Sequence, residues 1–251
     1  MKIIRIMISI CFTFLPISTA LAQMNTMAVT PEGGKVAQDP SLIAAASQSS
    51  THLDQSNEDH LARIFDFKGE VKILKRNAQD WVPAQKEMII EAGDQILTGK
   101  DAYMDVVYDA HFLNISRIEA QTKAEFRTIE PTDLHLEDGM IFNALDGLMG
   151  QKYQVSTPTA VAAVRGTTFD VGFDMDTKIT TAFVFPDQSP HVGEIAFESL
   201  NNQGSSQVLI EGQKIEEGSP ITSIPEPELA KGQDNLNQLT GNEQVATLRA
   251  E

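Results

Sequence analysis

Apolar and polar positions alternate in short runs through the middle of the chain, and these runs are rich in Val, Ile, Phe, Tyr and Thr. Turn pairs such as Gly93-Asp94 and Asp138-Gly139 separate the runs, at intervals of about 8–12 residues. The runs are GEVKILK, AYMDVVYDAHFLNIS, AEFRTIE, LHLEDGMIFNAL, KYQVSTP, GTTFDVGFD, ITTAFVFPD, EIAFESL and SQVLIEGQKI. None has a helical stripe, so the pattern predicts one all-β domain over residues 63–218, solenoid-like or sandwich/barrel-like.

The two flanks of this domain lack such a pattern. Residues 23–62 are rich in Ser, Gln, Ala, Thr and Pro and show no sustained period, which predicts a flexible leader. Residues 219–251 predict a polar, mostly disordered tail. Pro220, Pro225 and Pro227 argue against regular structure in its first part, and we expect only a marginal helix near its end.

Residues 1–22 have the pattern of a cleavable export signal. Lys2 and Arg5 precede the apolar run IMISICFTFLPI, and the tripeptide ALA at 20–22 has the small-x-small pattern of a cleavage site. The alternative is an uncleaved anchor, but the run is shorter than the roughly 20 apolar residues that a bilayer span needs. We therefore expect a periplasmic or secreted mature protein without a transmembrane segment.

Cysteine content and charge exclude several classes of function. The only cysteine, Cys11, lies in the predicted signal, so the mature chain has no thiol for a disulfide, a metal site or a nucleophile. The formal net charge is −16. Such a surface repels nucleic acids and anionic lipids, whose binding depends on neutralising phosphates. We expect neither as a partner, and no cofactor.

The stretch VSTPTAVAAVRGTTFDVGF contains an arginine and a glycine at its centre. In a strand, Phe169, Val171 and Phe173 share one face, and an unbroken strand would place Arg165 on that same apolar face. An unpaired guanidinium there is costly. Either Gly166 forms a bulge that turns Arg165 outward, or a carboxylate or strand-end carbonyls hold Arg165 near the core. Both arrangements predict a structural joint.

Several short motifs together resemble the FecR domain family over residues 63–218. They are Gly69-x-Val71, Gly93-Asp94-x-Ile96-x-Thr98-Gly99, Gly139 at a strand start, Val155-x-Thr157-Pro158 and Val164-Arg165-Gly166-Thr167-x-Phe169-x-Val171. The resemblance implies an extracytoplasmic all-β module without known catalysis. It also implies a structural signature made of Gly93, Asp94, Gly139, Thr157, Pro158, Arg165, Gly166, Thr167 and Phe169.

This chain departs from the plan of the signalling members of that family. Those members also have a cytoplasmic anti-sigma segment, a transmembrane helix and a receptor-contacting domain, none of which the sequence predicts here. We therefore expect an exported, non-catalytic module that serves as a protein-interaction or scaffold element, or as a regulator of an envelope signal. Its expected partner is an unidentified envelope protein.

Catalytic and metal-binding alternatives have weaker signals. The five histidines show no zinc-ligand spacing, and His135, near Glu137 and Asp138, comes nearest to a metal group. A Ser-His-Asp triad stays open, although no G-x-S-x-G elbow is present. The many carboxylates permit a carbohydrate-cleaving or carbohydrate-binding protein, but aromatic residues are sparse and Trp81 is the single tryptophan.

Overall fold

The computed structural model describes residues 62–146, 148, 152–187, 193–201, 205–242 and 245–246. The chain divides into two units, Met1–Thr51 and His52–Glu251, and every described residue belongs to the second. The predicted signal at 1–22, Cys11 and the predicted leader up to residue 61 lie outside the described residues.

The described residues form sixteen strands and the helix α2 (Glu226–Thr240). The strands are β1 (Arg63–Lys68), β2 (Val71–Leu74), β3 (Val82–Pro83), β4 (Gln95–Thr98), β5 (Tyr103–Val107), β6 (Asn114–Ile118), β7 (Lys123–Thr128), β8 (Thr132–Leu145), β9 (Tyr153–Ser156), β10 (Ala160–Val164), β11 (Thr168–Asp174), β12 (Ile179–Phe185), β13 (Glu194–Ser199), β14 (Ser205–Ile210), β15 (Gln213–Glu216) and β16 (Thr222–Ser223). The sequence prediction of an all-β fold is confirmed, and the predicted runs contain most of these strands.

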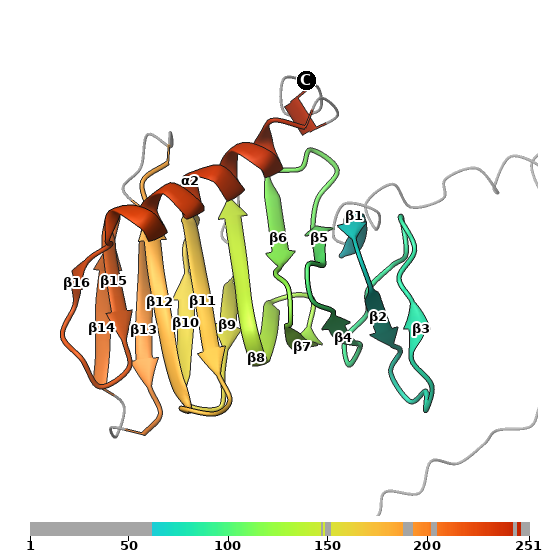
Figure 1. Cartoon of the computed structure of the whole chain (residues 1–251), viewed down its shortest axis with the longest axis horizontal. Coiled ribbons are helices and arrows are strands. Elements are labelled where there is room, and N and C mark those ends of the chain that lie inside the picture. Colours follow the sequence, from blue (N-terminus) through green and yellow to red (C-terminus); the bar gives the residue numbers. More distant parts are fainter. Residues whose placement is uncertain are drawn as a thin grey trace, which may run out of the picture. The chain divides into compact units, whose positions relative to one another are not determined.

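The strands form two sheets that share β8 (Figure 1). Sheet A has the order β1-β5-β6-β8-β11-β12-β15-β16. Sheet B has the order β3-β2-β4-β7-β8-β9-β10-β13-β14. Neighbours are antiparallel except β8 and β9, which are parallel. Residues 132–138 of β8 pair in sheet B, and residues 139–145 pair in sheet A.

Gly139 allows β8 to pass from one sheet to the other. Its φ of 98° lies in the region that favours glycine. A Cβ added at this position would come within 2.7 Å of the Thr122 Cα, which is too close for any side chain. The strand therefore bends where both a positive φ and a close backbone approach require glycine.

The two sheets enclose one apolar core. Strand alternation sends one set of side chains from each sheet inward, such as Ile73 and Ile96 from sheet B and Phe169 and Val171 from sheet A. The opposite face of sheet A is also apolar, with Phe142, Phe183 and Phe185 among its buried residues. This second face explains why nearly every residue of β11 is buried.

Helix α2 covers that second face and contacts β8, β11 and β12 (Figure 1). Its buried or partly buried leucines, Leu229, Leu236 and Leu239, pack in the same cluster as the phenylalanines. Polar contacts add to this packing. Arg117 holds Asp105 through two hydrogen bonds of 2.8 and 2.9 Å, and it donates a third, of 2.8 Å, to Gln238 of α2.

The segment after Gly218 is more regular than the sequence predicted. Residues 222–223 form β16, and α2 begins at Glu226 with Pro227 in its first turn. The expectation that the prolines exclude regular structure here is corrected, because proline needs no amide hydrogen bond in the first turn of a helix. Residues 247–251 lie outside the described part. Among the described residues, no helix is long and apolar enough to cross a membrane.

Candidate functional site

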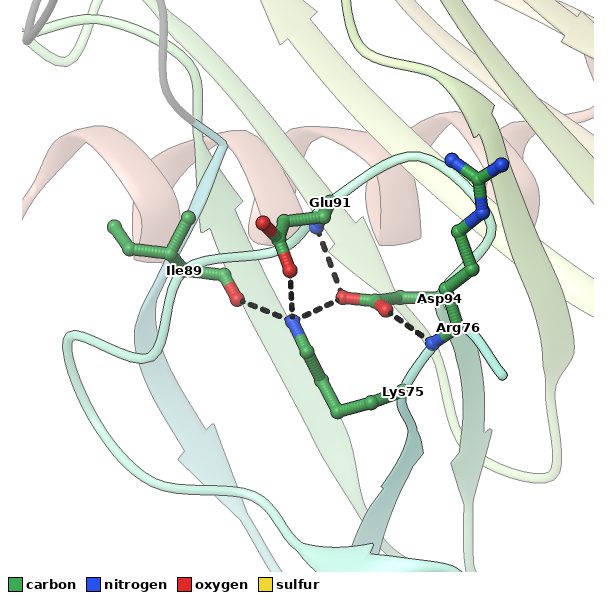
Figure 2. A network of polar contacts seen from close by, with 5 residues as sticks. All are labelled: Lys75, Arg76, Ile89, Glu91 and Asp94. Carbon is green, nitrogen blue, oxygen red and sulfur yellow. Dashed lines mark hydrogen bonds and ion pairs between the residues drawn. The ribbon is translucent and has the colours of Figure 1, made fainter. Parts of the chain in front are cut away.

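Asp94 lies fully buried at the corner before β4 and serves as the centre of a polar network (Figure 2). One carboxylate oxygen accepts hydrogen bonds from the Lys75 Nζ at 2.6 Å and from the Glu91 backbone N–H at 2.9 Å. The other accepts from the Arg76 backbone N–H at 2.9 Å. Gly93, with φ 92°, supplies the backbone turn that brings Asp94 inward. The carboxylate is therefore satisfied by the chain itself.

Lys75 completes this corner from the end of β2. Its Nζ contacts the Glu91 carboxylate at 3.2 Å and donates to the Ile89 carbonyl at 3.1 Å, as Figure 2 shows. Partial burial acts to lower the pKa of Lys75, but the hydrogen bonds to Asp94 and Glu91 raise it above its ordinary value. The lysine therefore stays charged and links the end of β2 to residues 89–94, which is a structural role.

The turn between β9 and β10 is built around the Thr157 side chain. Its hydroxyl oxygen accepts hydrogen bonds from the backbone N–H of Thr159 at 3.2 Å and of Ala160 at 2.9 Å, and it lies 2.7 Å from the Thr180 hydroxyl. Pro158 is exposed at the tip of the turn. A threonine that closes its own turn in this way leaves its hydroxyl fully used.

Residues 165–167 connect β10 of sheet B to β11 of sheet A. Gly166 has a φ of 101°, and Arg165 is exposed. Arg165 points outward, as in the first of the two arrangements expected from the sequence. The expected bulge is corrected, because residues 165–167 link two strands of different sheets and no single strand runs through Gly166. Thr167 is buried, and Phe169 lies fully buried in the core. Apart from Phe169, which lies in the core within β11, the signature residues stand at turns, strand ends and a strand bend.

His135, Ser156 and Asp133 meet on the outer face of sheet B. The Ser156 hydroxyl donates to the Asp133 carboxylate at 2.7 Å, and the His135 Nδ1 lies 3.2 Å from the same hydroxyl. A catalytic triad needs the histidine between the serine and the acid. Here the serine lies between the other two and donates its hydrogen bond to Asp133, so the three residues do not have the order of a triad.

The protonation of His135 agrees with a structural cluster. Burial, followed by the positive charge of Arg127, lowers the pKa of His135 below its ordinary value, so the imidazole is neutral at pH 7. Within the described ranges, no group of three His, Cys, Asp or Glu residues is suited to hold a metal ion. His111 is exposed, and His52, His60 and His191 lie outside the described residues.

Strand β14 forms one end of sheet B and is the candidate interaction site. In the described part of the chain it pairs with β13 alone. Its sequence, SSQVLI, has no charged residue and no proline. Val208 is 55% exposed and Ile210 is 43% exposed, although both are large apolar residues. At the end of the strand the Ile210 N–H donates to the Gln213 side chain at 3.1 Å. The rest of this edge is flanked by exposed apolar side chains.

The surface beside this edge has a regular pattern. Cross-strand pairing aligns Val208 with Ala196 and Ala163, which gives an apolar row across three strands. Glu198 pairs with Ser206 on one side of this row, and Glu194 pairs with Ile210 on the other. We call the seven exposed residues Ala163, Glu194, Ala196, Glu198, Ser206, Val208 and Ile210 the edge patch.

The two glutamates of the edge patch make no ion pair with another described residue. The sequence predicted strands at EIAFESL and SQVLIEGQKI but did not predict which of them lies at an edge. That information comes from pairing between distant segments. The sequence contained no signal for it, because edge strands commonly carry charged residues and SSQVLI carries none.

Comparisons with known proteins leave the family resemblance as a prediction. No family model matches the chain, and no curated protein matches it. Two similar crystal structures from Parabacteroides distasonis ATCC 8503 are each described as a "putative anti-sigma factor". The structure at 1.65 Å has a TM-score of 0.42 and 16% identity, over 53% of this chain and 59% of that one. The structure at 2.50 Å has a TM-score of 0.32 and 15% identity, over 62% and 60%.

The chain thus spans about three fifths of the length of each solved structure that it matches. Both identities are low, and both TM-scores are below 0.5.

Proposed function

We propose that this chain is an exported, non-catalytic β-module that binds a protein of the cell envelope through β14, as a scaffold or as part of signal regulation. The observation that supports this proposal is the exposed edge of sheet B. An extended segment of a partner can add to such an edge, where backbone hydrogen bonds give affinity and alternate side chains give specificity. The Val208 row of the edge patch offers the side-chain contacts.

The other sheet ends in the described part of the chain are protected against such addition. Strands β3 and β16 have two residues each, and β3 contains Pro83. Strand β1 carries charged residues, and residues 87–90 cover it. The Ile64 N–H donates to the Met88 carbonyl at 2.9 Å, and the Glu87 N–H donates to the Ile64 carbonyl at 2.8 Å. Short length, proline, charge and cover are the usual ways to block an edge. Strand β14 has six residues, no proline and no charge, and the Gln213 side chain covers its edge at the Ile210 N–H.

Site-specific photo-crosslinking in the native envelope tests the proposal. A photoreactive residue at position 208 is expected to crosslink one envelope protein. The separate variant Val208→Lys is expected to lose that protein in a pull-down from the same envelope. The matched control is position 175, where Met175 is 56% exposed in a turn away from the edge. Equal crosslinking from both positions, or binding that survives Val208→Lys, contradicts the proposal.

The carbohydrate alternative has no comparable support. Sugar-binding surfaces commonly present exposed aromatic faces, and in the described part of the chain Trp81 is half-buried before β3. We therefore propose protein binding alone.

A further inference from the structure

We infer that a basic segment adds to β14. In this segment, Lys or Arg stands two positions before and two positions after a central apolar residue. This inference rests on the proposed strand addition and specifies the chemistry of the partner. It follows from the arrangement of charge and apolar surface on the edge patch.

The apolar row fixes the centre of the added segment. On an added strand, the residue opposite Val208 would extend the row formed by Val208, Ala196 and Ala163. Because Val208 is 55% exposed, a partner side chain that covers it removes apolar surface from water. A β-branched or aliphatic residue fits this position best, since cross-strand pairs of such residues stabilise a sheet.

The glutamates fix the flanking positions. Side chains two residues apart on a strand point to the same face. The residues two positions from the centre would therefore lie opposite Ser206 and Ile210. Across the β13–β14 pair, Ser206 lies opposite Glu198 and Ile210 lies opposite Glu194. Two strand spacings, about 10 Å, separate the added strand from β13. A glutamate and a lysine or arginine side chain together span this gap.

The two side chains that lie between also favour such pairs. Ser206 is small, so it leaves room above it for a basic side chain to reach Glu198. Ile210 is 43% exposed, and its surface can pack against the aliphatic stem of a basic side chain that reaches Glu194. Neither glutamate has an ion-pair partner among the described residues that such a contact would have to replace.

Charge also argues against a second copy of this chain on β14. The formal net charge of each chain is −16, and a second edge patch would bring two further glutamates to the same face. Like charges brought together at an interface are unfavourable, whereas complementary charge increases both the association rate and the specificity. A basic segment is the occupant that this surface complements.

Four synthetic peptides test the inference against the full chain: TKTVTKT, its neutral counterpart TQTVTQT, its acidic counterpart TETVTET, and KTTVTTK. The last has the same composition as TKTVTKT, but its lysines fall on the opposite face from the valine. Binding is measured by fluorescence anisotropy at low and at physiological salt. We expect TKTVTKT to bind about fivefold more tightly than TQTVTQT at low salt, since each exposed ion pair contributes little. We expect TETVTET to bind most weakly.

Variants of the protein locate the effect. The double substitution Glu194→Gln/Glu198→Gln is expected to remove the preference for TKTVTKT. The matched control Glu226→Gln/Glu228→Gln, which removes two exposed charges from α2, is expected to preserve it. Equal affinity for TKTVTKT and KTTVTTK, or a preference that survives the Glu194/Glu198 substitutions, overturns the inference. Both results leave strand addition in place.

A separate variant distinguishes failure of the inference from failure of the proposed function. Val208→Lys is expected to weaken binding of the basic and neutral peptides, because it places a positive charge in the apolar row. If all peptides bind this variant as they bind the wild type, or if none binds the wild type, strand addition at β14 fails and the inference fails with it. A dimer that dissociates on Val208→Lys would place a second copy on β14 and would also overturn the inference.

Discussion

Two buried aspartates, Asp94 and Asp170, have opposite surroundings. Both side chains are nearly or fully removed from solvent. Asp94 accepts hydrogen bonds from two backbone N–H groups and from Lys75. Asp170 lies on the face of sheet A that α2 covers, paired in register with Phe142 and Phe183, and its Oδ1 has no hydrogen-bond partner.

The consequence for ionisation follows from this difference. Burial raises the pKa of Asp170 to about 8, and the nearby positive charge of Lys231 only partly opposes it, while Glu119 adds to it. Asp170 is therefore mostly protonated at neutral pH, as expected of a carboxyl group in apolar surroundings. Asp94 serves instead as a hydrogen-bonded link between the end of β2 and the corner before β4. Burial alone therefore does not determine what a carboxyl group contributes to stability, because that contribution depends on its hydrogen-bond partners.

The largest expected effect is the loss of the Asp94 network. Asp94→Ala leaves two backbone N–H groups and the Lys75 ammonium without their acceptor, so the free energy of unfolding is expected to fall by about 4 kcal/mol. Urea unfolding measures this change. Asp80→Ala, at an exposed position in the preceding loop, is the control and should change stability by less than about 0.5 kcal/mol. A loss at Asp94 no larger than that of the control would contradict the structural role of the network.

At the Arg165–Gly166 joint, unlike at the two aspartates, the backbone conformation and not a buried carboxyl group determines stability. Gly166→Val is expected to lower the free energy of unfolding by about 3 kcal/mol, because a β-branched residue is strained at a φ of 101°. Arg165→Ala should cost less than about 0.5 kcal/mol, since Arg165 is exposed. Thermal and urea unfolding of both variants measure the difference. Equal and negligible losses would show that the joint needs neither residue.

The sequence predicts local features of this fold well. Alternation alone places Phe169, Val171 and Phe173 on one face, and all three are buried in the core. Continuing the alternation of β11 backwards would place Arg165 on the apolar face, so the sequence predicts a joint at Gly166. Gly166 has a positive φ in the structure. These predictions depend on neighbouring residues only, which is why a single sequence suffices for them.

Features that depend on distant segments were not predictable in the same way. Parity placed Asp170 on the face opposite Phe169, but only the packing of α2 makes that face buried. The tail appeared mostly irregular because its helix has few apolar residues, and such a helix gains its stability from packing on the sheet. The accessible edge at β14 likewise emerges only from the order of strands in sheet B.

The last prediction concerns the protonation of Asp170. A folded-state pKa of about 8, raised above the ordinary value of 3.8, means that the native state keeps a proton that the unfolded state releases. The contribution of Asp170 to stability is therefore complete below about pH 4, falls by about 1.4 kcal/mol per pH unit as the pH rises, and levels off above about pH 8. Asp170→Asn removes this dependence, so its stability relative to the wild type should increase by about 2 kcal/mol between about pH 5.5 and about pH 7. Urea unfolding across this range checks the trend, with Asp176→Asn, exposed in the turn after β11, as the control. If the difference between Asp170→Asn and the wild type does not change with pH, burial beneath α2 does not keep Asp170 protonated, and the prediction is wrong.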